Sequence, residues 1–179
     1  MKLLRTIRLD PSDTFVFEPA AEPGEWAVSG AFVFWNSDPA TLEGKARTAF
    51  RSGFLGVATL GWSTLVQIVD ATEGDRLEVV DRLAAQLMAK FGAPTRDDAI
   101  AAADEELAFV ESLCNQPSDT LIAVHRTFED GAVRESFRTL RPRGGAKPVR
   151  AFSFLEVEGE DEQPAEDVNL ITMADRGSK

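Results

Sequence analysis

Apolar residues recur every three or four positions in two adjacent segments in the middle of the chain. The first segment, residues 74–91, has the period of an amphipathic helix and ends at Gly92. The second starts at Thr95, where Asp98 completes a variant of the capping box, and ends at Asn115. Because only a few residues join the two segments, we expect an antiparallel helical hairpin. The inner sides are predicted to consist of Leu77, Val80, Leu83, Ala84, Leu87, Met88 and Phe91, and of Ile100, Ala103, Leu107, Val110, Leu113 and Cys114.

Alternating or β-branched residues predict strands in the first third of the chain. Residues 2–9 and 14–18 have strand character and are separated by a turn sequence. Residues 25–35 alternate with apolar side chains on both faces, which is typical of a central strand. A short helix with a weak point at its glycine is expected at 38–50, and a β-branched strand at 63–71.

The strongest hairpin signal is Asp130-Gly131, which lies between two strand-like segments within residues 120–141. A two-residue loop fixes the register of the paired strands, because opposing residues follow by counting outwards from the turn. One face is then apolar except for a compensated Arg126–Glu135 pair. The predicted pairs are Glu129–Ala132, Phe128–Val133, Thr127–Arg134, Arg126–Glu135, His125–Ser136, Val124–Phe137 and Ala123–Arg138.

The order of elements indicates the fold class. One more strand is expected at 149–157, so the order is β-β-β-α-β-α-α-β-β-β, without regular alternation. We therefore predict an α+β domain at 1–157, with a mostly antiparallel sheet of five to seven strands and about three helices. Residues 158–179 form an acidic C-terminal segment, expected to be loosely ordered, with a candidate short strand at 168–172.

Composition narrows the class of protein. A hydrophobic fraction of 44%, with 12 Phe and 3 Trp, is enough for a globular core. The single cysteine excludes an intramolecular disulfide, and no apolar stretch approaches ~18 residues, so we expect a cytoplasmic protein. A formal net charge of −11 disfavours nucleic acid and anionic membranes as partners. At strand spacing most aromatic side chains are expected in the core, and Trp26, Trp35 and Trp62 are the best candidates to reach a surface or pocket.

The cations are concentrated in one segment. Between 134 and 150 the only acidic residue is Glu135. The glycines of RPRGGAKP (141–148) let backbone amides approach a ligand, and arginine and lysine there could bind phosphate or carboxylate. The alternative is that these cations pair with the acidic remainder of the chain. The candidate anion-binding or partner-binding residues are Arg134, Arg138, Arg141, Arg143, Lys147 and Arg150.

His125 and Ser136 raise the alternative of a hydrolase. The predicted register places them opposite each other, as a base and a nucleophile require. No acid is in register on that face to orient the imidazole, and the flanking arginines would lower its pKa. We therefore expect a polar sheet face and no catalytic residue, with His125 and Ser136 as the enzymatic alternative.

The cysteine and the carboxylates of the second long helix are better explained by a structural role than by a catalytic or metal-binding role. Cys114 lies near the C-terminal end of its predicted helix on the apolar side, so we expect it to be buried. One His and one Cys exclude the common zinc sites. A row of carboxylates on the second long helix is interpreted as a solvated face, so no metal and no cofactor is expected. This row is Asp97, Asp98, Asp104, Glu105 and Glu106.

The stretch GVATLGWS (56–63) has the outline of a phosphate-binding P-loop. Trp62 occupies the position of the lysine, a helix precedes the stretch and a strand follows it, which is the reverse of a P-loop. We interpret Trp62 as an aromatic anchor of the next strand and the glycines as hinges. These are Gly53, Gly56 and Gly61.

Two segments, RTIRLDPSDTFVFE (5–18) and FRSGFLGVATLGWSTLVQIVD (50–70), resemble a small bacterial family of unknown function. The resemblance covers most of the chain, and its motifs carry no known chemistry. It associates such genes with molybdenum-dependent formate oxidation and its assembly factors, and so implies an accessory or maturation role.

Together these observations favour a non-catalytic cytoplasmic binding or accessory protein with an anion-receptive face at 134–150. Its ligand would be a small anion or a protein partner. A homodimer is a further candidate, because a sheet with two apolar faces needs more cover than three helices. The alternative is a small enzyme that acts on a phosphorylated or carboxylated metabolite, with His125 as the acid or base.

Overall fold

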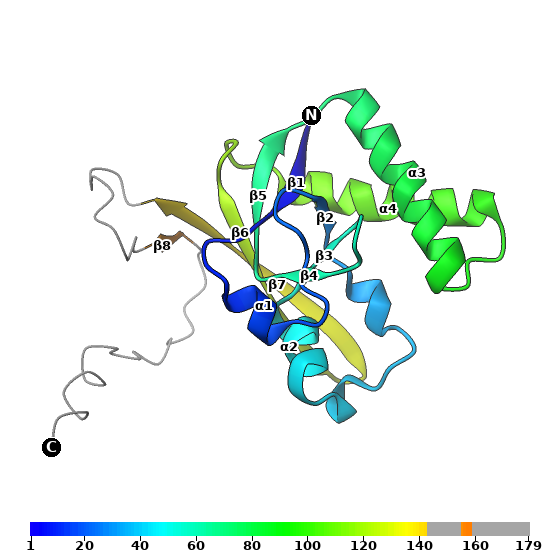
Figure 1. The fold of residues 1–179 in the computed structure, drawn as a ribbon, viewed down its shortest axis with the longest axis horizontal. Coiled ribbons are helices and arrows are strands. Elements are labelled where there is room, and N and C mark those ends of the chain that lie inside the picture. The colour runs from blue at the N-terminus through cyan, green and yellow to red at the C-terminus, as the bar shows by residue number, and fades with distance from the viewer. Residues whose placement is uncertain (143–154, 159–179) are drawn as a thin grey trace, which may run out of the picture.

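The computed structural model describes residues 1–142 and 155–158 of the chain. Within them, eight strands form one antiparallel sheet in the order β4-β3-β2-β1-β5-β6-β7-β8 (Figure 1). The predicted α+β class with a mostly antiparallel sheet is therefore confirmed. The strands are β1 (Lys2–Ile7), β2 (Trp26–Val28), β3 (Phe54–Gly56), β4 (Trp62–Ser63), β5 (Leu65–Asp70), β6 (Leu121–Glu129), β7 (Ala132–Pro142) and β8 (Leu155–Glu158).

Helices connect the strands and cover the sheet. The predicted helical hairpin is present, because α3 and α4 pack against each other and α4 also contacts β1 and β2. Thr72 and Asp75 form a capping box at the start of α3, and Thr95 accepts a hydrogen bond from the Asp98 amide at the start of α4. In the described residues the helices are α1 (Ser12–Val16), α2 (Gly44–Ser52), α3 (Glu73–Lys90) and α4 (Arg96–Leu113), with the 3-10 helices η1 (Ala31–Phe34) and η2 (Pro39–Thr41).

The prediction of a strand at 14–18 is wrong, because this segment belongs to α1 and the residues that follow it. The Asp13 side chain of α1 is buried and accepts hydrogen bonds from the backbone N–H and the hydroxyl of Thr64. Phe17 is buried directly after the helix. A helical turn satisfies the local backbone while these two side chains fix the segment to the sheet.

The strand predicted at 25–35 ends early, at Val28. Gly30 has a φ of 78°, in the left-handed region, and turns the chain into η1. A Cβ at this glycine would lie 2.5 Å from the Cβ of Leu55. The apolar run that reads as one central strand is therefore divided between a short strand and a 3-10 turn.

The helix predicted at 38–50 is interrupted in the structure. Asp38 caps η2 as expected, since its carboxylate accepts a hydrogen bond from the Ala40 amide at 3.0 Å. The turn ends at Thr41, and α2 begins only at the predicted weak point, Gly44. The unpredicted strand β3 follows α2 almost directly, and pairs with β2 and β4.

The β6–β7 hairpin has the predicted register at every one of the seven pairs. Asp130 and Gly131 both have positive φ, as the two-residue turn requires. β8 pairs with β7 and forms part of the strand predicted at 149–157. The remainder of that strand and the candidate strand at 168–172 lie outside the described residues.

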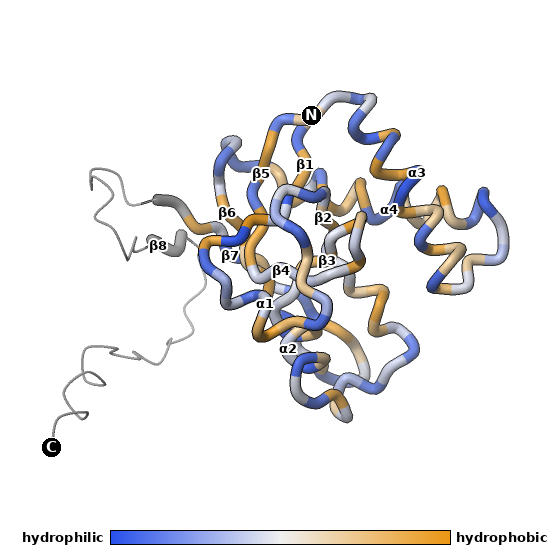
Figure 2. Tube along the Cα trace, in the orientation of Figure 1, coloured by the Kyte–Doolittle hydropathy of each residue, from blue (hydrophilic) through white to orange (hydrophobic). Residues whose placement is uncertain are grey.

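The core lies between the sheet and the α3–α4 hairpin and extends under η1 and α2. Hydrophobic and hydrophilic residues alternate along α3 and α4 (Figure 2). Leu77, Met88 and Phe91 were predicted on the inner side of α3 but are 58%, 44% and 37% exposed. The buried stripe of α3 is Val79, Val80, Leu83, Ala84 and Leu87. None of the helices in the described residues is long and apolar enough to cross a membrane.

Candidate functional site

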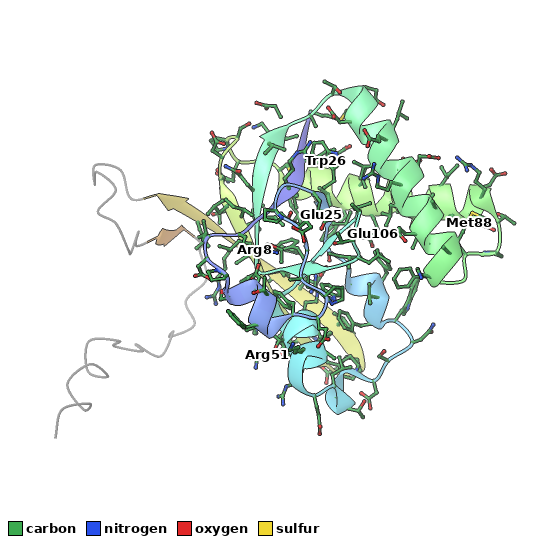
Figure 3. The ribbon with its side chains drawn as sticks, viewed as in Figure 1. Arg8, Glu25, Trp26, Arg51, Met88 and Glu106 are labelled. Atoms are coloured by element: carbon green, nitrogen blue, oxygen red, sulfur yellow. The ribbon has the colours of Figure 1, made fainter. Side chains whose placement is uncertain are left out.

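Two hollows adjoin each other around η1, and together we call them the η1 groove. One, of about 430 Å³, lies between η1 and the turn of the β6–β7 hairpin. The other, of about 570 Å³, lies between η1 and the α3–α4 connection. Phe32, Trp35 and Glu106 line both hollows. Glu106 belongs to α4, and its side chain is labelled in Figure 3.

The 3-10 geometry of η1 divides its aromatic side chains between the core and the groove. Phe34 is 7% exposed, stacks on Trp62 at 5.3 Å between ring centroids and meets Phe50 edge to face. Phe32 and Trp35 are three residues apart, so a 3-10 helix places them on the same side. Phe32 contacts Phe91 edge to face, whereas Trp35 is 87% exposed at the rim.

The hairpin turn adds apolar side chains to the opposite rim. Phe128 on β6 and Val133 on β7 are paired in register and are 41% and 38% exposed. Phe91 adds a third partly exposed side chain beyond η1. Large apolar side chains gathered around a concavity are typical of a binding surface.

Glu106 provides a carboxyl group inside this apolar groove. Its Oε2 atom is buried and has no hydrogen-bond partner among the described residues. Burial raises the pKa of Glu106 from its ordinary 4.5 to about 7, and the charge of Glu135 adds to this increase. Glu105 also raises it, and Arg126 opposes the shift. The groove therefore contains a carboxyl group that gains or loses its proton near neutral pH.

Under the groove, a buried arginine joins β2, α2, β6 and β7. Arg126 is 1% exposed, and its Nε donates to Glu135 at 2.7 Å. Its other nitrogens donate to the carbonyl oxygens of Phe50 at 3.1 Å, Gly53 at 2.7 Å and Ser29. Burial lowers the pKa of Arg126, and the ion pair with Glu135 opposes that shift. This network fixes the elements that form one side of the groove.

The residues proposed for catalysis lie on the exposed face of the hairpin, away from this buried network. His125 is exposed and opposes Ser136, as predicted. The Ser136 hydroxyl donates to the backbone carbonyl of His125 at 3.2 Å. This hydrogen bond joins the hydroxyl to the backbone of His125, and the assignment of the pair as base and nucleophile stays a prediction.

The structure brings together only part of the predicted cationic set. Arg134 is 61% exposed and lies 3.6 Å from Glu129 and 3.5 Å from Asp130, so nearby acids compensate some of its charge. Arg138 is exposed opposite Ala123, on the same face as His125. Arg141 opposes Glu156 of β8 in the register. Arg143, Lys147 and Arg150 lie outside the described residues.

The P-loop-like stretch binds a carboxylate of the chain itself. It forms the connection between β3 and β4, and the Glu25 carboxylate accepts hydrogen bonds from the amides of Ala58 at 2.8 Å and Thr59 at 3.0 Å. The Thr59 hydroxyl donates to the same carboxylate at 2.6 Å. A Cβ at Gly56 would lie 2.4 Å from the carboxyl carbon of Glu25, so a larger residue there would displace this carboxylate. Trp62 is 7% exposed, as expected for an anchor.

The cysteine is buried in the core, and two carboxylates of the row on α4 take part in an ion pair or a helix cap. Cys114 is buried, as predicted, and burial raises the pKa of its thiol to about 11. In the row of carboxylates, Asp104 forms an ion pair with Arg76 at 2.9 Å, and Asp98 takes part in the N-terminal cap of α4. Among the described residues, no group of three or more His, Cys, Asp or Glu side chains could hold a metal ion.

Glu106 is the functional candidate that the sequence pattern assigns to the wrong environment, as part of a solvated row. A signal was present, because Glu106 follows the buried Ala99 and Ala103 at helical spacing and precedes Val110 by four residues. Of the three tryptophans, Trp35 reaches the surface as predicted, whereas Trp62 is in the core.

Comparisons with known proteins give one result. A family described as "Family of unknown function (DUF6505)" matches residues 1–153. No curated protein and no solved structure matches the chain.

Proposed function

The chain belongs to this family of unknown function, and we propose that it is a non-catalytic binding protein whose binding site is the η1 groove. The observation that carries the proposal is Trp35, which is 87% exposed where the two hollows adjoin. An exposed tryptophan beside a concavity is the kind of residue that dominates binding energy at protein interfaces.

The shape and chemistry of the groove support a protein partner. Its walls are mainly aromatic and aliphatic, and the walls come from η1, α4 and the β6–β7 hairpin, which the Arg126 network and the core hold in place. A preformed apolar site reduces the entropy lost on binding. We therefore propose that a partner inserts a large apolar side chain next to Trp35.

Affinity capture from the native host tests this proposal when the native chain is compared with Trp35→Ala. The matched control is Phe15→Ala, since Phe15 is 73% exposed on α1 and does not line the groove. We expect Trp35→Ala to weaken binding of the captured partner at least about tenfold, in line with a hot-spot tryptophan. Equal retention of the partner by native chain and Trp35→Ala, or loss with Phe15→Ala alone, would contradict the proposal.

The exposed hairpin face is a second candidate surface, for an anionic partner. The observation that favours it is the register, which places Arg134 and Arg138 on the same face as His125. If this face binds the partner, Arg134→Ala with Arg138→Ala will abolish binding and leave the melting temperature unchanged. Retention of the partner by this double variant would exclude the face.

We further propose that the protein works in the cytoplasm as an accessory factor. The resemblance of residues 5–18 and 50–70 to a bacterial family associated with formate oxidation supplies the first partners to test. These are the subunits of the molybdenum-dependent enzyme and its assembly factors. The same Trp35→Ala and Phe15→Ala comparison applies to each of them.

A further inference from the structure

We propose that the η1 groove, taken as the binding site proposed above, receives a lysine side chain of the partner, with its ammonium group on Glu106. The apolar part of that side chain would lie against Phe32 and Trp35. This inference adds the chemistry of the ligand to the proposed function, and rests on it. Four features of the described residues lead to it.

The first feature is the unused hydrogen-bonding capacity of Glu106. Its Oε2 atom is buried without a partner in the described part of the chain, although Glu106 lines both hollows. A buried carboxyl oxygen without a hydrogen bond is unfavourable. Rotation of the carboxyl group toward the groove would let a donor group of a ligand satisfy this oxygen.

The second feature is that the nearest buried cation is committed elsewhere. Arg126 directs its hydrogen bonds to Glu135, Ser29, Phe50 and Gly53. Arg126 therefore influences Glu106 through its charge but leaves the Oε2 atom without a hydrogen bond.

The third feature is the charge of the groove. The larger hollow is lined by Asp98, Glu105 and Glu106 but by only one cation, Lys90. In the smaller hollow Glu106 is the one charged residue among the described lining residues. The groove is thus acidic within apolar walls, which favours a cation over the anionic or neutral alternatives.

The fourth feature is the aromatic lining. Aromatic faces attract cations, and the chain contains one such contact, the Arg5 guanidinium 3.6 Å from the ring centre of Trp26. A lysine has a narrow apolar stem and a compact charged end, so its stem can lie against Phe32 and Trp35 while the ammonium reaches Glu106. The wider guanidinium of an arginine suits a deep single carboxylate less well.

Three blocked tripeptides test this inference on the full chain: acetyl-Leu-Lys-Phe-amide, the same peptide with acetyl-lysine, and the same peptide with glutamate at the centre. Their affinities are measured by Trp fluorescence or by NMR titration. We expect the lysine peptide to bind at least about tenfold more tightly than the other two, because only it brings a charged donor to Glu106.

Variants separate the charge of Glu106 from the shape of the groove. Glu106→Gln should remove the preference for lysine and leave the affinity for the acetyl-lysine peptide unchanged. Glu78→Gln is the matched control, since Glu78 is 59% exposed on α3 and lies outside the groove. Trp35→Ala should weaken all three peptides.

A pH series supplies an independent readout. Because the pKa of Glu106 is about 7, raising the pH from about 6 to about 8 ionises it, and lysine binding should strengthen in that interval. The acetyl-lysine peptide should show no such change. The charged groups that act on Glu106 are Glu135, Arg126 and Glu105.

Two outcomes overturn the inference. If the lysine and acetyl-lysine peptides bind equally, and both lose affinity in Trp35→Ala, the lysine inference is wrong while the proposed function stands. If no peptide binds at millimolar concentration, the groove does not recognise a lysine. The same conclusion holds if neither Glu106→Gln nor Trp35→Ala changes the affinity for the peptides.

Discussion

Glu25 and Glu106 have different surroundings, and these surroundings determine what each carboxyl group can do. The Glu25 carboxylate accepts hydrogen bonds from two amides and a hydroxyl of the β3–β4 connection and from the Glu22 amide. The loop that has the outline of a P-loop therefore binds a carboxylate of the same chain. The Glu106 carboxyl is buried in the groove, and its Oε2 atom lacks a partner among the described residues. Glu106 therefore brings a carboxyl group with a pKa of about 7 into the groove.

The raised pKa of Glu106 predicts a change of stability with pH. The folded chain holds this proton more tightly than the unfolded chain, so the favourable contribution is complete below about pH 4.5 and is lost as pH rises to about 7. Glu106→Gln mimics the protonated form. The native chain loses this contribution as the pH rises, and the variant does not. The unfolding free energy of the variant minus that of the native chain should therefore be about 2–3 kcal/mol larger at about pH 8 than at about pH 5.

Denaturant unfolding at several pH values measures this difference, with Glu78→Gln as the control. Glu78 is 59% exposed, so its substitution should shift the stability curve little at any pH. Parallel pH curves for the native chain and Glu106→Gln would show that Glu106 ionises normally in the folded chain.

At the scale of elements, the sequence predicts the helices and strands whose structure depends on neighbouring residues. The Asp130-Gly131 turn defines the register of β6 and β7, and the spacing of apolar residues defines α3 and α4, so these elements are predicted correctly. Residues 14–18 and 25–35 are predicted wrongly because contacts distant in sequence determine their structure. Asp13 bonds to Thr64, and the turn at Gly30 packs on Leu55.

The buried arginine shows how elements are joined. Arg126→Met removes the hydrogen bonds from β6 to the ends of α2 and β2, and leaves Glu135 without its ion-pair partner. Loss of one member of a buried ion pair costs about 3–5 kcal/mol, so we expect a loss of that order in unfolding free energy. Denaturant unfolding measures it.

Arg134→Met is the matched control for this prediction. Arg134 belongs to the same hairpin but is 61% exposed, with contacts to Glu129 and Asp130 at 3.5 Å or more. A surface pair of this kind contributes little, so the change should stay within about 0.5 kcal/mol. Similar losses in the two variants would mean that the Arg126 network does not hold the elements together.

At the scale of the molecule, the η1 groove combines segments that are far apart in sequence. Trp35, Glu106 and Phe128 come from η1, α4 and β6. Sequence spacing identifies Trp35 as a surface candidate and could identify Glu106 as an inward residue of α4. Only the packing of the helical hairpin against the sheet places them around one concavity, and no local pattern contains that information.

The structure draws attention to the η1 groove, whereas the sequence draws attention to the cations at 134–150. The cations at 134–150 are the most unusual feature of the sequence, and the structure describes only part of them. The groove combines a concave shape, exposed aromatic side chains and a carboxyl group whose pKa is raised. These are the properties that binding sites share.

The most direct test is an NMR titration of the ¹⁵N-labelled chain with the lysine and acetyl-lysine peptides. We expect shifts in the Trp35 indole N–H and in the amides of residues 31–36 and 128–133. The Trp62 indole, which is buried in the core, should remain unchanged. Shifts confined to residues 134–138, or no shifts at millimolar peptide, would contradict the assignment of the η1 groove as the binding site.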